Sequence, residues 1–173
     1  MKAYIGLGAN VGKRKKNMEL ALQELRRVVK ITKVSSLYES APWGYPHQKK
    51  FLNAVVEIET NEEPLKLLSL LKGIESRIGR KKTFKWGPRV IDLDILFYDS
   101  WIVNSPKLKI PHPEIKTRAF VLVPLLELNE SITYPENEKQ LKDIVNVSSL
   151  LGNQDIRKIA TFNVRTWRWD ETV

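Results

Sequence analysis

Cysteine is absent from this 173-residue sequence, which excludes a disulfide framework, a thiolate nucleophile and a zinc–thiolate site. Long apolar runs are missing as well: no stretch approaches a membrane span, and the first residues lack the apolar segment of a signal peptide. We therefore expect a cytoplasmic protein. Repeats and linkers are also missing, so residues 1–173 should form one domain, with a core over about 1–150 and an arm over about 151–173.

Acidic residues are few relative to basic ones. The sequence has 20 Asp and Glu against 29 Lys and Arg, and its net charge is +9. This excess predicts an anionic partner, and composition leaves open whether that is a nucleotide, a nucleic acid or a membrane surface.

Two aspartates interrupt an apolar strand pattern over residues 90–97. One face of this strand should carry Ile91, Leu93, Ile95 and Phe97, and the other Val90, Asp92, Asp94 and Leu96. Asp92 and Asp94 would then stand about 7 Å apart along the strand. Aspartate is depleted in strands, and a carboxylate pair suits Mg²⁺, which is a hard cation. The alternative is a solvated strand face on which two acids bind nothing.

A basic segment precedes this strand and favours the metal interpretation. Between positions 72 and 89 the only acid is Glu75, and the cations are Lys72, Arg77, Arg80, Lys81, Lys82, Lys85 and Arg89. Cations beside a carboxylate pair suit a polyphosphate, because metal and guanidinium groups share its oxygens. Trp86-Gly87-Pro88 predicts a turn, and so a loop that moves over a bound ligand.

The remaining periodicity predicts an α+β fold. Strands are expected at about 3–7, 31–38 and 51–60, and helices at about 17–29 and 64–78, the second ending at Gly79. With the strand at 90–97 the order is βαββαβ, the ferredoxin-like pattern of an antiparallel sheet with helices packed on it. A further helix at 119–128 should be interrupted by Pro124. A short helix near 141–145 and a final strand or apolar arm should follow.

Side chains elsewhere point to a flat ligand and to phosphate. Phe51 and Asn53 share the non-core face of their strand, where a ring can stack on a heterocycle and an amide can read its edge. A half-exposed Phe and a solvated Asn are equally compatible with the pattern. His112 lies in a Pro-flanked turn six residues before Arg118, and both can bind phosphate, although a lone histidine is more often structural.

The glycines at 6, 8 and 12 fit neither the dinucleotide-binding spacing nor a Walker A loop, so a tight turn is expected there.

Residues 86–96, Trp-Gly-Pro-Arg-Val-Ile-Asp-Leu-Asp-Ile-Leu, resemble the signature of the 6-hydroxymethyl-7,8-dihydropterin pyrophosphokinase family. Further blocks are similar in the same order and extend the resemblance over about 3–145: residues 4–10, 51–54, 74–75 with 79–80, and 111–112 with 118–120. The resemblance implies an enzyme of folate biosynthesis that transfers the β,γ-pyrophosphoryl group of ATP to the pterin's hydroxymethyl oxygen and releases AMP. It implies no nucleic acid or membrane partner, and a monomer or weak homodimer is expected.

The same resemblance implies roles for individual residues. Asp92 and Asp94 would hold two Mg²⁺ ions, and Arg80 and Arg89 would act with them on the phosphates. Asn53 would bind the pterin between the rings of Phe51 and Phe120, beside the stretch Ala41, Pro42 and Trp43. The ATP site would include Glu75, Lys82, Trp86, His112 and Arg118. Loops 41–50 and 80–89 correspond to the family's mobile lids.

Some positions depart from the family pattern. Pro113 follows His112 where some members carry a tyrosine, and Lys82 stands where others have arginine, in a loop one residue shorter. The arm from about Gly152 exceeds the compact form of the family, and it is expected either to self-associate or to cover an edge strand.

Two rival interpretations remain. A basic ferredoxin-like sheet also binds RNA, but no stretch matches the RNP1 pattern, and two aspartates would repel a phosphate backbone. A member that has lost activity is disfavoured because Asp92, Asp94, Asn53 and Arg89 are all present.

Overall fold

A single antiparallel sheet carries all the strands of the predicted βαββαβ unit. The computed structural model describes residues 1–80 and 84–171. The strands lie in the order β5 (Asp92–Tyr98), β1 (Lys2–Ala9), β4 (Phe51–Glu59), followed by β2 (Lys30–Val34) and β3 (Leu37–Ser40). The ferredoxin-like prediction is confirmed. Within the described ranges no helix is long and apolar enough to cross a membrane.

The expected strand at 31–38 is in fact two strands. Both β2 and β3 pair with β4, and Ser35 and Ser36 lie buried between them. The Ser35 hydroxyl accepts a hydrogen bond from the amide of Val55, and the Ser35 amide donates to the carbonyl of Val55. The amide of Ser35 and both backbone polar groups of Val55 are therefore paired at the break.

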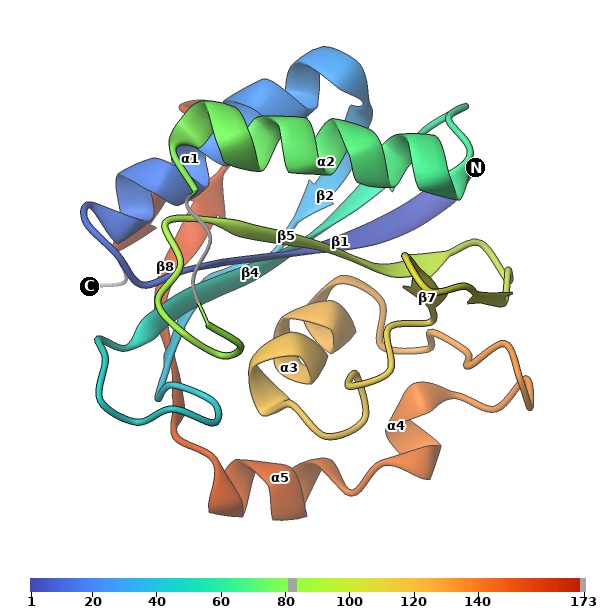
Figure 1. Ribbon diagram of the computed structural model, residues 1–173. Helices are drawn as coiled ribbons and strands as arrows, with labels where there is room; N and C mark the ends of the chain where they lie inside the picture. The colour runs from blue at the N-terminus through green and yellow to red at the C-terminus, as the bar shows by residue number, and fades with distance from the viewer. Residues whose placement is uncertain (81–83, 172–173) are drawn as a thin grey trace.

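Two helices cover one face of the sheet (Figure 1). They are α1 (Arg14–Val28) and α2 (Pro64–Ile78), and their apolar sides pack on the alternate residues of β1 and β4 that point toward them. Gly79 ends α2 as predicted, with a φ of 111° and its amide donating to the carbonyls of Glu75 and Ser76. The chain then continues from the end of α2 toward Arg89 and β5.

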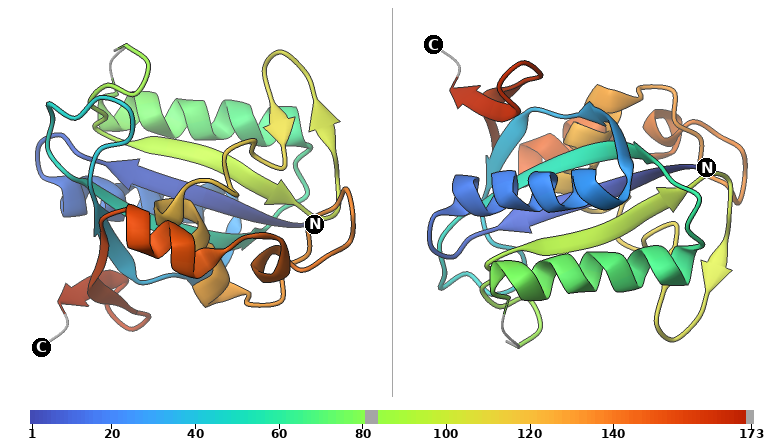
Figure 2. Two further views of the ribbon diagram at one scale, coloured as in Figure 1. Left: turned by 90° about the horizontal axis from the view of Figure 1, so that it is seen from below. Right: turned by 90° about the horizontal axis from the view of Figure 1, so that it is seen from above.

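The opposite face of the sheet carries α3 (Ala119–Leu128), with α4 (Leu141–Ile144) and α5 (Val147–Asn153) outside it (Figures 1 and 2). Contrary to expectation α3 runs through Pro124 without interruption. The proline removes only one intrahelical bond, to the carbonyl of Phe120, and its ring is buried.

The prediction that Phe97 shares a face of its strand with Leu93 and Ile95 was also wrong. Between β1 and β5 the register shifts, so that Tyr4 pairs with Phe97 but Ile5 pairs with Ile95. Leu96 is the extra residue of this bulge, and both Leu96 and Phe97 consequently belong to the apolar cluster under α3. Asp92 and Asp94 precede the bulge and keep the predicted face.

The C-terminal arm extends the sheet. β8 (Ile156–Asn163) pairs with β3, and β9 (Arg168–Glu171) pairs with β8, so the arm covers the edge of β3. Trp169 is fully buried against α1, and its indole N–H donates to the carbonyl of Ser35 at 2.9 Å. The short strands β6 (Val103–Asn104) and β7 (Lys109–Ile110) form a separate pair.

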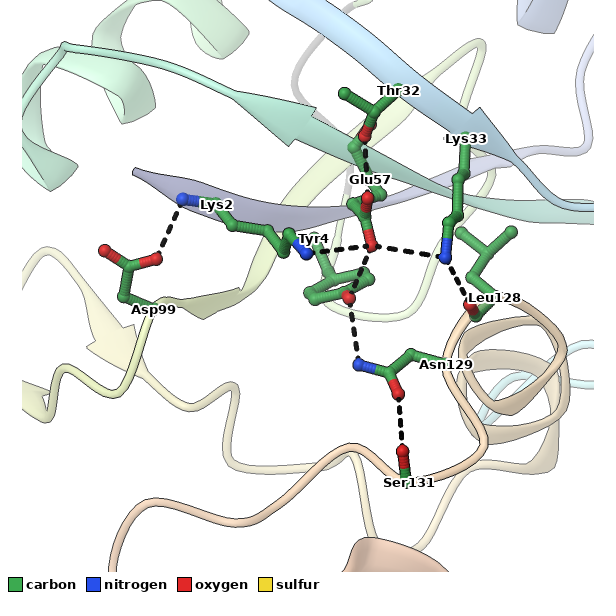
Figure 3. Close-up of polar contacts among 9 residues, drawn as sticks. All are labelled: Lys2, Tyr4, Thr32, Lys33, Glu57, Asp99, Leu128, Asn129 and Ser131. Atoms are coloured by element: carbon green, nitrogen blue, oxygen red, sulfur yellow. Dashed lines mark hydrogen bonds and ion pairs between the residues drawn. The ribbon is translucent and has the colours of Figure 1, made fainter.

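A buried polar cluster anchors the C-terminal end of α3 to the sheet (Figure 3). The carboxylate of Glu57 accepts hydrogen bonds from the hydroxyls of Tyr4 (2.7 Å) and Thr32 (2.8 Å). Asn129, just after α3, donates to Tyr4. Lys33 donates to the last carbonyl of α3 and lies 3.9 Å from Glu57. We call Tyr4, Thr32, Glu57 and Asn129 the anchor cluster.

Candidate active site

A cleft opens on the α3 face, toward the end of the sheet where β4 begins. It encloses about 830 Å³, counting the mouth that opens to solvent. Its floor is Gly6 and Gly8 of β1, which place no side chain in the cleft. Gly8 pairs with Asn53 on one side and with Asp92 on the other, which places these two side chains two strands, or about 10 Å, apart.

The cleft brings together most of the residues that the sequence singles out. Those on its wall are Ala41, Trp43, Phe51, Asn53, Trp86, Arg89, Asp92, Asp94, His112, Arg118 and Phe120. Pro42, Glu75 and Arg80 are not part of the wall, and Lys82 lies outside the described residues.

Asp92 and Asp94 form the acidic edge of the cleft. Burial and the neighbouring charge of Asp92 raise the pKa of Asp94 to about 7, although Lys72 and Arg118 act in the opposite direction. Among the described residues no group of three or more His, Cys, Asp or Glu could hold a metal. A cation here would take its other oxygens from water and a substrate, which is how Mg²⁺ binds beside phosphates.

A buried carboxylate supports this edge from beneath. Glu75 accepts hydrogen bonds from the amide of Leu93 (2.8 Å) and from the guanidinium of Arg80 (2.6 Å). Arg80 also lies 3.6 Å from Asp92, so it bridges the two carboxylates. Lys72 adds an ion pair with Glu75 at 3.2 Å. Glu75 thus fixes β5 and Arg80 without reaching the cleft itself.

The opposite end of the cleft is aromatic. The rings of Trp43 and Phe120 meet edge to face with centroids 6.3 Å apart, and the Arg118 guanidinium lies within 6 Å of both. Asn53 is buried and donates to the hydroxyl of Ser40 at 2.7 Å, which fixes the orientation of its amide. A planar ring system would meet a fixed amide and aromatic side chains here.

His112 and Arg118 supply donors along the cleft. The Nδ1 of His112 accepts from the amide of Glu114 at 3.2 Å, so the proton of a neutral imidazole lies on Nε2. Burial and the charge of Arg118 lower the pKa of His112, which favours this neutral form. Arg118 pairs with Glu114, but its buried Nε has no hydrogen-bond partner among the described residues.

The two loops that border the cleft are joined to each other by residues that the sequence did not single out. Asn10 donates to Gln48 and to the carbonyl of Lys49 in one loop, and accepts from the amide of Arg89 in the other. Gln48 donates to the carbonyl of Trp86. A buried Asn in a strand-to-helix turn is typical of turns in general, so nothing in the sequence distinguished Asn10.

Gly44 allows the closest approach of the two loops. Its φ is +85°, and a Cβ at this position would lie 2.6 Å from the indole of Trp86. Only glycine fits this contact, and Tyr45 and Phe84 add a ring contact with centroids 5.0 Å apart. The loops therefore form one cover over the mouth of the cleft.

Comparisons with known proteins agree with this geometry. The model of the 7,8-dihydro-6-hydroxymethylpterin-pyrophosphokinase family matches residues 4–130. Two relatives named 2-amino-4-hydroxy-6-hydroxymethyldihydropteridine pyrophosphokinase come from Aquifex aeolicus and Bacillus subtilis. The Aquifex protein is 42% identical, and the match covers 81% of this chain and 88% of the relative. The Bacillus protein is 43% identical, and the match covers 75% of this chain and 79% of the relative.

Longer proteins match as well. The folic acid synthesis protein fol1 of Schizosaccharomyces pombe is 37% identical over 93% of this chain, which spans 22% of that protein. The crystal structure of Plasmodium falciparum HPPK-DHPS has a TM-score of 0.74 at 15% identity, covering 98% of this chain and half of the other, which supports the fold alone. The match to the family model and the bacterial relatives establish that the chain belongs to the 7,8-dihydro-6-hydroxymethylpterin-pyrophosphokinase family, whose enzymes transfer pyrophosphate from ATP to the pterin in folate synthesis.

Proposed function

We propose that the cleft under α3 is where this chain carries out the pyrophosphoryl transfer, with 6-hydroxymethyl-7,8-dihydropterin beside Asn53 and the triphosphate of ATP beside Asp92 and Asp94. One observation carries the proposal: Asn53, Gly8 and Asp92 stand in one row across three strands. A bicyclic ring held by the amide at one end of this row presents its hydroxymethyl arm to the carboxylates at the other. Gly8 leaves the space between them open.

The carboxylate pair fits Mg²⁺, and two ions are proposed. Burial and the charge of Asp92 raise the pKa of Asp94, and a bound cation would offset both effects. The described part of the chain offers no group of three such ligands that would compete with phosphate oxygens. When bound, Mg²⁺ neutralises charge on the triphosphate and polarises the phosphorus under attack.

The transfer itself needs positioned groups more than covalent help from the protein. The hydroxymethyl oxygen attacks the β-phosphorus of ATP and gives up its proton to water, the bond from that phosphorus to the α,β-bridging oxygen breaks, and AMP leaves with that oxygen. Arg118 and the neutral Nε2–H of His112 would donate to phosphate oxygens, and Arg89 and Trp86 would close the nucleotide side. Arg80, held by Glu75, would counter the charge that gathers beside Asp92.

The stacking partners of the pterin are proposed on the same grounds. Phe51, two residues before Asn53 on β4, and Phe120 of α3 both line the cleft, and Trp43 and Ala41 line it beside them. Pro42 follows Ala41 but does not reach the wall, so it is proposed only to shape the loop.

The test is ³¹P NMR of the purified protein with ATP, Mg²⁺ and 6-hydroxymethyl-7,8-dihydropterin. We expect AMP and a pterin diphosphate to form, and turnover to stop when a chelator removes the metal. An Asp92→Asn variant serves as the matched control, because it keeps the shape of the side chain and loses the charge. Formation of ADP, or full activity of this variant, would contradict the proposed arrangement.

A further inference from the structure

The segment that joins α5 to β8 touches both walls of the cleft, although it lies beyond residue 130, where the match to the family ends. Its residues are Gln154 and Asp155. Figure 1 shows the chain passing from α5, outside α3, up to β8 at the edge of the sheet. These two consecutive residues therefore stand between the wall formed by α3 and the wall formed by loop 41–50.

Gln154 holds the wall formed by α3 with both ends of its amide. Its Oε1 accepts from the amide of Ala119 at 2.8 Å, and its Nε2 donates to the carbonyl of Thr117 at 2.8 Å. These two peptides flank Arg118, the N-cap residue of α3, whose own side chain makes no capping bond. The first amides of a helix have no partner inside it, so Gln154 supplies one from outside.

Asp155 holds the wall formed by loop 41–50. Its carbonyl accepts from the amide of Ala41 at 3.2 Å, and its carboxylate pairs with Lys50 at 3.1 Å. The next residue, Ile156, pairs with Ser40, whose hydroxyl accepts the hydrogen bond from Asn53. The loop is thus fastened at its start and at its end.

The side chains that these contacts hold face each other across the cleft. Trp43 comes two residues after Ala41, and Phe120 comes one residue after Ala119. Their rings are in contact, and Arg118 lies over both. The separation of the two walls is set by residues that are adjacent in the sequence, because one peptide unit fixes Gln154 relative to Asp155.

We propose that Gln154 and Asp155 form a clasp that positions Phe120 and Trp43 for the pterin and Arg118 for the phosphates. They are positioning residues, since neither lines the cleft. The inference rests on the proposed function of the cleft. It adds that the C-terminal segment takes part in substrate recognition as well as in the sheet.

The experiment compares Gln154→Ala, Gln154→Glu and Asn146→Ala with the unchanged chain, measuring kcat and KM for the pterin and the thermal midpoint. Gln154→Ala should raise the KM about five- to tenfold, the effect of one or two hydrogen bonds, and leave kcat within about threefold. Gln154→Glu keeps the oxygen that accepts from Ala119 and places a charge at the N-terminus of α3, so stability should recover. Its KM should stay raised, because a carboxylate cannot donate to Thr117.

Asn146→Ala is the matched control. Asn146 caps α5 by accepting from the amide of Ser149 at 2.9 Å, in the same part of the chain but away from the cleft. We expect a comparable loss of stability and an unchanged KM. A KM within about twofold of the unchanged chain in both Gln154 variants would overturn the clasp, because single hydrogen bonds exceed that effect.

Amide hydrogen exchange separates this inference from the proposed function. Without ligands, the amides of Ala41 and Ala119 should exchange faster in Gln154→Ala and at the normal rate in Asn146→Ala. Absence of pterin turnover in the unchanged chain would defeat the proposed function, and the exchange rates would still decide whether the clasp holds the two walls. Equal exchange in all proteins would overturn it.

Discussion

Two polar groups of residues lie on the same face of the sheet and differ in how their charges are compensated. On β1 and β4 the pair Tyr4–Glu57 and the pair Gly8–Asn53 are separated only by Gly6–Val55. The anchor cluster surrounds a buried Glu57, and the cleft contains Asp94. In the cluster the carboxylate of Glu57 accepts hydrogen bonds from Tyr4 and Thr32, whereas Asp94 lies on the wall of the cleft, where its neighbour Asp92 has the same charge.

The pKa values of the two acids move in opposite directions. Burial alone would raise the pKa of Glu57, but the hydrogen bonds from Tyr4 and Thr32 and the charges of Lys2 and Lys33 hold it below its ordinary value. Burial and Asp92 raise the pKa of Asp94. A buried acid is therefore a weak indicator of a functional site, and an acid on a cleft wall whose pKa the fold raises is a stronger one.

The largest expected effect comes from removing Asp94. Asp94→Ala should lower kcat by roughly 10³-fold, since loss of a ligand of the proposed metal site would cost several kcal/mol of transition-state stabilisation. The free energy of unfolding should not fall, because the substitution removes the cost of burying a carboxylate and its repulsion with Asp92. Steady-state kinetics and chemical denaturation of the same sample measure both. Full turnover would remove Asp94 from the metal site.

Glu57→Ala should show the reverse pattern. It leaves Tyr4 and Thr32 without their acceptor, and the free energy of unfolding should fall by about 2–3 kcal/mol. The KM for the pterin should not change at temperatures where the protein is folded. Glu57→Gln, which keeps one acceptor oxygen, is the control and should lose less. If Glu57→Ala were as stable as the unchanged chain, the anchor cluster would not stabilise the packing of α3 on the sheet.

Asn53→Ala tests the cleft on its pterin side. The affinity for the pterin should fall about tenfold, because a ring that pairs with the amide loses one or two hydrogen bonds. The affinity for ATP should change by less than about threefold, since Asn53 lies about 10 Å from Asp92. Calorimetric titration with each ligand distinguishes the two. Equal weakening of both would remove Asn53 from the pterin site.

The last test is the pH dependence of the free energy of unfolding. The folded chain keeps a proton on Asp94 up to about pH 7, whereas the unfolded chain releases it near 3.8. The contribution of Asp94 to the free energy of unfolding therefore falls as the pH rises through this window. In a chelator, the stability of Asp94→Asn relative to the unchanged chain should rise over the same window.

The contribution of Glu57 to the free energy of unfolding changes with pH in the opposite direction. Because its folded pKa is lowered, its stabilisation is present above the unfolded value of 4.5 and is lost as the pH falls through the folded value. The deficit of Glu57→Gln should thus shrink toward acid pH. Denaturation curves at several pH values that showed the same slope for both acids would contradict the comparison.

The sequence predicted the elements that depend on local pattern. Period two placed Asp92 and Asp94 on one face, and Pro64 and Gly79 marked the ends of α2. It did not predict the bulge at Leu96, because a bulge depends on the partner strand.

Contacts between distant parts of the chain could not be predicted from the sequence either. Asn10 joins two loops, and Gln154 reaches a helix 35 residues earlier. Each is a common polar residue in a turn or at a helix end, so only the fold gives it a role.

The extension of the sheet also affects how the protein resists aggregation. With the arm in place, the exposed edge passes from β3 to β9, which has only four residues, three of them charged: Arg168, Asp170 and Glu171. Short, charged edge strands are poor templates for the addition of another chain. β3 carries Leu37 and Tyr38 at the edge that β8 covers. Without β8 and β9, the edge of the sheet would return to β3.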